Sequence, residues 1–247
     1  MDLADWGLYS YALARPEQVQ PYGVPTGAGE ILYNSTCLGF CANISSGVWA
    51  PSMSYIDGRL YLASMTRWTY DPTARVWPRI MWISSADMKD WSNPTWAEPW
   101  GIDPGPFQDP ISKKTYLNLM APNNSVDRIR GIYQCQVNPN SGKCIGSYRS
   151  LWDGTLSHNS TARPEGPRMY YKDKCYYLLI AEDIVITSNT SSLRNRLIKT
   201  GTDDLHRSSI ARPSSPEGPW TPAPNNPLIS NIGHARLHPK RRTGCLS

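Results

Sequence analysis

The stretch "PEGPRMYYKDKCYYLLIAE", residues 164–182, decides how this chain is expected to fold. Glu165 stands between two prolines and is followed by an apolar run, an Asp-containing turn and a second run that contains Tyr177. Short runs rich in Tyr, Ile and Leu, interrupted by turn residues, indicate β-strands. The stretch therefore predicts two paired strands with a carboxylate at their entrance.

Two other stretches have the same layout. They are "VWAPSMSYIDGRLYLAS", which begins at residue 48, and "IDPGPFQDPISKKTYLNLM", which begins at residue 102. Trp49, Asp103 and Glu165 stand at the starts of the three units, 54 and then 62 residues apart. A repeat of this length made of strands is typical of a β-propeller, in which each unit is one four-stranded blade. The sequence thus predicts an all-β propeller.

The first strand of each propeller blade lines the central channel, so residues at its entrance converge on one cavity. We therefore expect Trp49, Asp103 and Glu165 to occupy equivalent positions and to face the same space. Two carboxylates in one cavity suit the cleavage of a glycosidic bond, which needs a protonated acid beside the leaving oxygen. Apolar neighbours and the charge of Asp103 are expected to raise the pKa of Glu165, so that it keeps its proton.

A purely structural interpretation of the same residues stays open. Asp-Pro-Gly is a common turn sequence, so Asp103 could cap a turn. Glu165 could form an ion pair with Arg163 or Arg168.

Composition narrows the function classes. The 247 residues are 40% hydrophobic and 18% charged, with a net charge of +5 whose densest basic cluster is at the C-terminus. A nucleic-acid-binding face would need a basic stripe across a folded domain, so no such partner is predicted. The apolar runs are shorter than the ~20 residues of a membrane span, so no membrane partner is predicted. The chain has 10 Trp and 14 Tyr but only 2 Phe, which suits half-wet grooves that bind sugars.

Six cysteines and five glycosylation sequons favour a secreted protein. A four-residue loop is expected to place Cys135 directly opposite Cys144, so that a cross-strand disulfide can form. Cys37 and Cys41 could also form a bridge, whereas Cys175 is predicted to be a buried thiol. The sequon asparagines are Asn34, Asn43, Asn123, Asn159 and Asn189.

Five ordered motifs resemble glycoside hydrolase family 43, and fungal members especially. They are "DLADWGLYSYALARPEQ", "GVWAPSMSYIDGRLYLAS", "WSNPTWAEPWGIDPGPF", "ARPEGPRMYYKDKCYYLLIAE" and "RSSIARPSSPEGPWTPAPNNPLI". The family comprises β-xylosidases and α-L-arabinofuranosidases on a five-bladed propeller. The resemblance implies an inverting hydrolase of xylan- or arabinan-derived oligosaccharides or polysaccharides. A monomer with no required cofactor is expected, and a structural calcium ion is possible.

The resemblance also implies roles for particular residues. Glu165 matches the general acid, and Asp103 matches the carboxylate that tunes this acid and orients the substrate. Trp49 matches a position suited to stacking on a sugar ring. His206 and His234 match cavity-facing histidines of later blades. Inversion needs a further carboxylate as base, and in the family this base lies on a strand upstream of the "DLADW" motif.

The chain is expected to form an incomplete five-bladed propeller. Residues 1–238 would contain part of blade one, blades two to four and the start of blade five, and residues 239–247 would form a basic tail. Because the base strand lies outside the sequence, little hydrolysis is expected from this chain. A carbohydrate-binding propeller without catalysis is therefore the alternative.

Overall fold

A computed structural model describes residues 7–15, 18, 47–67, 79–99, 101–123, 128–156, 162–184 and 207–230. These residues form thirteen β-strands and no α-helix. The all-β class predicted from the sequence is therefore confirmed. Cys37, Cys41, His206 and His234 lie outside the described residues.

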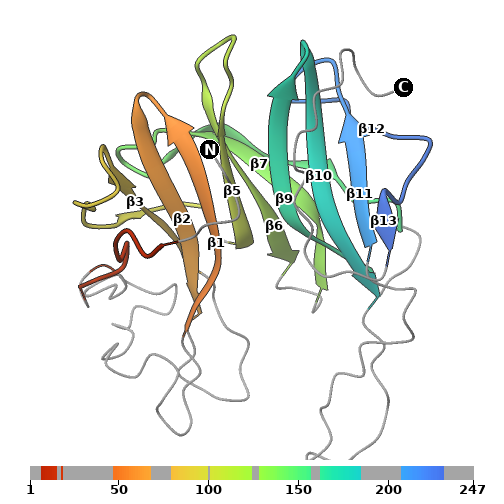
Figure 1. Ribbon diagram of the computed structural model, residues 1–247. Coiled ribbons are helices and arrows are strands. Elements are labelled where there is room, and N and C mark those ends of the chain that lie inside the picture. The colour runs from red at the N-terminus through yellow and green to blue at the C-terminus, as the bar shows by residue number, and fades with distance from the viewer. Residues whose placement is uncertain are drawn as a thin grey trace, which may run out of the picture.

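The strands form three sheets in chain order (Figure 1). The first sheet contains β1 (Gly47–Ile56), β2 (Arg59–Arg67), β3 (Arg79–Ser85) and β4 (Thr95–Trp96). The second contains β5 (Ile102–Gln108), β6 (Thr115–Asn123), β7 (Arg128–Val137) and β8 (Cys144–Trp152). The third contains β9 (Ala162–Lys172), β10 (Cys175–Ile184), β11 (Arg207–Arg212) and the short strands β12 (Thr221–Pro222) and β13 (Ile229–Ser230), which both pair with β11.

Each sheet is an antiparallel meander that begins with one of the three sequence units. The first strands β1, β5 and β9, called the inner strands below, lie side by side with β5 in the middle (Figure 1). The prediction that each unit opens one sheet is confirmed. The first two sheets have the predicted four strands, whereas the third has five, because β12 and β13 both pair with β11. Residues 7–15, which were expected to contribute to blade one, form no strand.

Apolar side chains that alternate along the strands fill the space between the sheets. Tyr61, Ala63 and Met65 on β2 belong to one buried cluster with Leu117 and Leu119 on β6, and this cluster joins the first sheet to the second. A separate cluster that includes Met120, Ile132, Leu178 and Ile180 joins the second sheet to the third. Burying one such side chain contributes roughly 1.5–3 kcal/mol, so the packed faces hold the three sheets together.

The predicted disulfide between Cys135 and Cys144 is present and joins β7 to β8. The expected register was wrong, because Cys144 pairs with Val137 and a β-bulge lies at Cys135. The loop closes between Asn138 and Lys143. The bulge lets the two sulfur atoms meet although the two residues are not directly opposite.

Cys175, at the start of β10, is not the buried thiol that the sequence predicted. It is half-buried and disulfide-bonded, and its partner lies outside the described residues. Among the sequons, Asn123 is the last residue of β6 and the other four asparagines lie outside the described residues. The secreted location therefore stays a prediction.

A buried carboxylate joins the β5–β6 turn to the third sheet. Asp109 accepts hydrogen bonds from the Ser112 hydroxyl at 2.5 Å, from the Ser112 and Ile111 N–H groups, and from the Tyr176 hydroxyl on β10 at 2.7 Å. Burial alone raises the pKa of Asp109, but these hydrogen bonds outweigh burial and lower the pKa below its ordinary value. The ionised form therefore stabilises the fold.

Acid is expected to weaken the fold through this residue. Because the folded-state pKa of Asp109 is lowered, its stabilisation is fully present above the unfolded-state pKa of about 3.9 and is lost as the pH falls through the folded-state pKa. In Asp109→Asn, the free energy of unfolding is expected to fall less steeply below this pH than in the wild type. Urea unfolding across a pH series measures both slopes, and equal slopes would contradict this role of Asp109.

Candidate active site

Each inner strand carries the same irregularity near its entrance. The residue before a proline has a positive φ in all three strands: 50° at Ala50, 55° at Asp103 and 59° at Gly166. The pairing register of each strand shifts at the same place. Proline has no N–H to donate to the ladder, and a β-bulge redirects the side chains around it. These three positions form one repeated feature, called the inner-strand bulge below.

The positions of the bulge show that Trp49, Asp103 and Glu165 are not all equivalent, although the sequence suggested that they are. Asp103 corresponds to Ala50 and Gly166, whereas Trp49 and Glu165 both stand one residue before the left-handed position. The error arises in the β5–β6 turn. Tyr116 follows its cross-strand partner by nine residues, but Tyr61 and Tyr177 follow theirs by seven. The β5–β6 turn is thus two residues longer than the corresponding turns of the other two units, so residues of the three units do not align by simple spacing.

The two candidate acids lie on neighbouring strands. Asp103 is only 7% exposed, and its Oδ2 accepts a hydrogen bond of 2.9 Å from the backbone N–H of Gly166, the residue after Glu165. Asp103 stands inside β5 rather than in a turn. Glu165 is half-buried on β9. The structure thus brings the Asp103 carboxylate next to the main chain of Glu165.

The backbones of β5 and β9 approach closely at this point. A Cβ at Gly105 would collide with the carbonyl oxygen of Pro167, so only glycine fits there. Nη1 of Arg168 donates hydrogen bonds to the carbonyl oxygens of Pro104, at 3.3 Å, and Pro167, at 2.8 Å. From the sequence, Arg168 was expected only as an ion-pair partner for Glu165. In the structure, Arg168 ties the two strands together beside Asp103.

Trp49 lies on β1, separated from β9 by β5. Trp49 is 45% exposed, and its carbonyl oxygen accepts a hydrogen bond of 2.7 Å from the Ser64 hydroxyl. An exposed indole face on a fixed backbone can stack on a sugar ring. The roles assigned to Trp49, Asp103 and Glu165 by resemblance remain predictions, as do those of His206 and His234.

Comparison with known proteins agrees with these motifs. The model of Glycosyl hydrolases family 43 matches residues 30–243, which is most of the chain. The chain belongs to glycosyl hydrolase family 43. The resemblance read from the five sequence motifs is thereby confirmed.

Curated relatives in family 43 include enzymes of two specificities. The chain is 27% identical over 232 residues to a beta-xylosidase of Bacillus subtilis and covers 36% of it. It is 28% identical over 247 residues to a non-reducing end alpha-L-arabinofuranosidase of Bacteroides ovatus and covers 37% of it. These matches take in 93% and 96% of this chain. The chain therefore spans little more than a third of the length of these relatives.

Solved structures of family 43 share the fold. A xylan beta-1,4-xylosidase of Bacillus halodurans matches with a TM-score of 0.60 and 26% identity, over 81% of this chain and 35% of that chain. The Bacteroides ovatus GH43B structure matches with a TM-score of 0.61 and 25% identity, over 93% of this chain and 36% of that chain.

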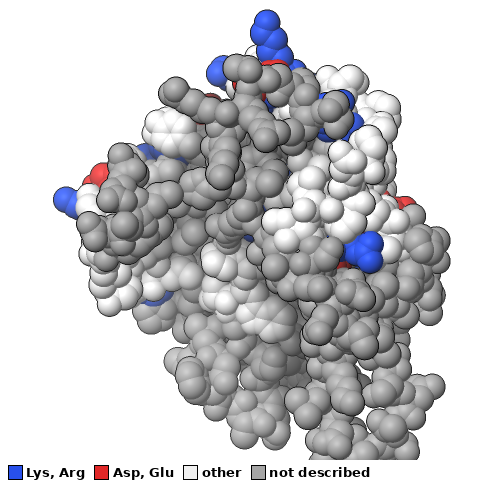
Figure 2. Space-filling model, turned by 45° about the vertical axis from the view of Figure 1, so that its right-hand side comes forward, with Lys and Arg blue, Asp and Glu red and all other residues white. Residues whose placement is uncertain are grey.

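Among the described residues of this family 43 chain, no group of three or more His, Cys, Asp or Glu side chains gathers to hold a metal ion. No helix of the described ranges is long and apolar enough to cross a membrane. On the face in Figure 2, the described Lys and Arg side chains lie in several separate places.

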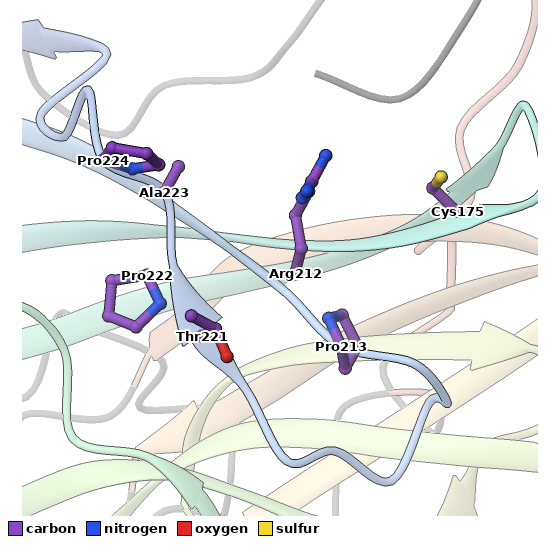
Figure 3. Close-up of a pocket in the computed structure, with 7 residues that line it drawn as sticks. All are labelled: Cys175, Arg212, Pro213, Thr221, Pro222, Ala223 and Pro224. Carbon is purple, nitrogen blue, oxygen red and sulfur yellow. The ribbon is translucent and has the colours of Figure 1, made fainter. Parts of the chain in front are cut away.

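A groove of about 520 Å³ lies at the edge of the third sheet, far from the two acids. Figure 3 shows its lining: Cys175, Arg212, Pro213, Thr221, Pro222, Ala223 and Pro224. On β10, Cys175 stands six residues before Ala181, the partner of Glu165, which corresponds to about 20 Å of extended strand. The groove contains none of the predicted site residues.

Proposed function

We propose that this chain belongs to a glycoside hydrolase that cleaves xylose or arabinose residues from xylan- or arabinan-derived substrates. Glu165 is the general acid, and Asp103 is the carboxylate that keeps this acid protonated. The observation that carries the proposal is the hydrogen bond from the Gly166 N–H to Asp103 Oδ2, which places the two acidic residues on adjoining inner strands. The family relatives named as xylosidase and arabinofuranosidase support the substrate class.

The chemistry follows from this arrangement. The carboxyl group of Glu165 donates its proton to the glycosidic oxygen as the bond between that oxygen and the anomeric carbon breaks. Water attacks the opposite face of the sugar and loses a proton to a base carboxylate, which gives inversion. None of the described residues is assigned as this base. The negative charge of Asp103 disfavours ionisation of Glu165 and so raises the pKa of the acid. No metal or organic cofactor enters these steps.

Trp49 and the arrangement of the sheets also have roles in the proposed function. The exposed indole of Trp49 serves as a stacking surface for a sugar ring, and the three sheets are blades of a five-bladed propeller that acts as a monomer. The same exposed indole favours a second candidate function, which is carbohydrate binding without hydrolysis.

Product release and binding distinguish the two functions. The 247-residue chain is incubated with para-nitrophenyl β-xyloside, para-nitrophenyl α-L-arabinofuranoside and xylo-oligosaccharides. Slow release of nitrophenol together with the inverted sugar anomer, seen by proton NMR, is the result expected of the glycosidase, because little hydrolysis is expected from this chain. Calorimetric binding of xylo-oligosaccharides without release would favour the binding function. If the chain shows neither binding nor release, both functions are contradicted.

A further inference from the structure

Glu182 is a buried carboxylate near the end of β10 that the acid–base chemistry does not use. Only 2% of it is exposed. Oε1 accepts hydrogen bonds from the N–H groups of Thr155, at 2.5 Å, and Leu156, at 3.2 Å. Oε2 accepts hydrogen bonds from the Thr155 hydroxyl at 2.6 Å and from the Ser209 hydroxyl. A buried polar group requires hydrogen-bond partners, and four donors converge on this carboxylate.

These contacts join three parts of the third sheet region. Glu182 is on β10 and Ser209 is on β11, whereas Thr155 and Leu156 belong to the connection that leaves β8 and leads to β9. Gly154, which precedes this pair, has a φ of +82°. A Cβ added at Gly154 would collide with Oε1 of Glu182 and approach the Cβ of Pro164 to 3.4 Å. The connection is therefore packed tightly between the Glu182 carboxylate and the start of β9.

The start of β9 carries the proposed acid. The β9–β10 register pairs Glu182 with Pro164 and Ala181 with Glu165. On the other side of Glu165, the N–H of Gly166 is held by Asp103 at 2.9 Å. The main chain of Glu165 is thus fixed on both sides. One support is Asp103, and the other is the packing of Pro164 against the segment that Glu182 binds.

We propose that Glu182 is a positioning residue for Glu165. By holding the β8–β9 connection against Pro164, it sets where β9 begins and hence where the carboxyl group of Glu165 points. This inference rests on the proposed function, because it takes Glu165 as the general acid. Displacing a catalytic group by about 1 Å can cost about 100-fold in rate, so a residue outside the chemistry can control turnover.

Three substitutions separate positioning from general stability. Glu182→Leu removes all four acceptor contacts, and Glu182→Gln keeps an oxygen that can accept from the Thr155 and Leu156 N–H groups. Gly154→Ala inserts a methyl group against Oε1 and so disturbs the same contact from the other side. Asp109→Asn is the matched control, because Asp109 is another buried carboxylate but binds β10 at Tyr176, near the opposite end of the strand.

Hydrogen–deuterium exchange gives a readout that does not depend on activity. Glu182→Leu and Gly154→Ala are expected to increase exchange in the peptide 163–169 and to leave the β1–β2 peptide 52–65 unchanged. Glu182→Gln is expected to restore wild-type protection, and Asp109→Asn is expected to leave the peptide 163–169 as in the wild type. Unchanged exchange in this peptide for Glu182→Leu, or an equal increase in both peptides, would overturn the positioning role.

Kinetics gives the second readout. A misplaced acid slows substrates with poor leaving groups more than those with good ones. Glu182→Leu is expected to lower kcat for xylobiose by about 10–100-fold with little change in KM, and to affect a dinitrophenyl xyloside much less. An equal loss for both substrates would contradict positioning. If Glu165→Gln is as active as the wild type, or if the wild type does not turn over, the proposed function fails. The exchange result then still decides whether Glu182 fixes the start of β9.

Discussion

Glu165→Gln is expected to lower the turnover of xylobiose by about 10²–10⁴-fold, because glutamine has the shape of glutamate but cannot supply the acid proton. Glu165 is half-buried on β9, so the nearly isosteric amide is expected to leave the strand in place. A dinitrophenyl xyloside, whose leaving group needs little protonation, is expected to lose much less. Initial rates on the two substrates, with thermal melting by circular dichroism, measure the effect.

The control is the same substitution at a carboxylate outside the site. Glu217 follows β11, has a 41% exposed side chain and pairs with Arg149 at 3.2 Å. Glu217→Gln is expected to keep wild-type turnover on both substrates. An unaltered rate for xylobiose in Glu165→Gln would remove Glu165 from the chemistry.

Asp103→Asn is expected to move the alkaline limb of the pH–rate profile to lower pH. The negative charge of Asp103 disfavours ionisation of its neighbour, so removing the charge lowers the pKa of Glu165. Above the new pKa, less of the acid is protonated, and activity near neutral pH is expected to fall. Asparagine tolerates a positive φ and keeps an oxygen for the Gly166 N–H, so the substitution tests charge rather than backbone shape.

Asp57 provides the matched control for this second experiment. It is also an aspartate with positive φ, 47°, but it lies in the turn after β1, where Oδ1 accepts a hydrogen bond of 2.6 Å from Gln108. Asp57→Asn is expected to leave the pH–rate profile unchanged. A profile of Asp103→Asn with the wild-type alkaline limb would show that Asp103 does not tune the acid.

Sequence reasoning located the architecture well because strand periodicity and turn residues act locally. Each of the three units opens one antiparallel sheet, with four strands in the first two and five in the third. Asp103 comes close to the Glu165 main chain because β5 and β9 lie next to each other. The alignment of residues among the three units was harder to predict from the sequence. It depended on the length of the turn between Asp109 and Lys114, which can vary without changing the strands on either side.

Other features depend on contacts between distant residues. The disulfide of Cys175 has no nearby cysteine in sequence to suggest it, so the residue resembled an apolar strand position. Glu182 binds Thr155, 27 residues earlier in the chain. The signal that could have revealed it is an acidic residue directly after the apolar run "YYLLIA". A carboxylate there is buried with the strand and must find donors elsewhere.

The inner-strand bulge separates architecture from chemistry. Ala50, Asp103 and Gly166 have the same left-handed backbone conformation although their side chains differ. The fold therefore requires this conformation before the proline but does not specify the side chain. Each sheet therefore carries a different side chain at this position while the hydrogen-bonded ladders on either side stay the same. Diversity of substrates within one scaffold then requires no new backbone.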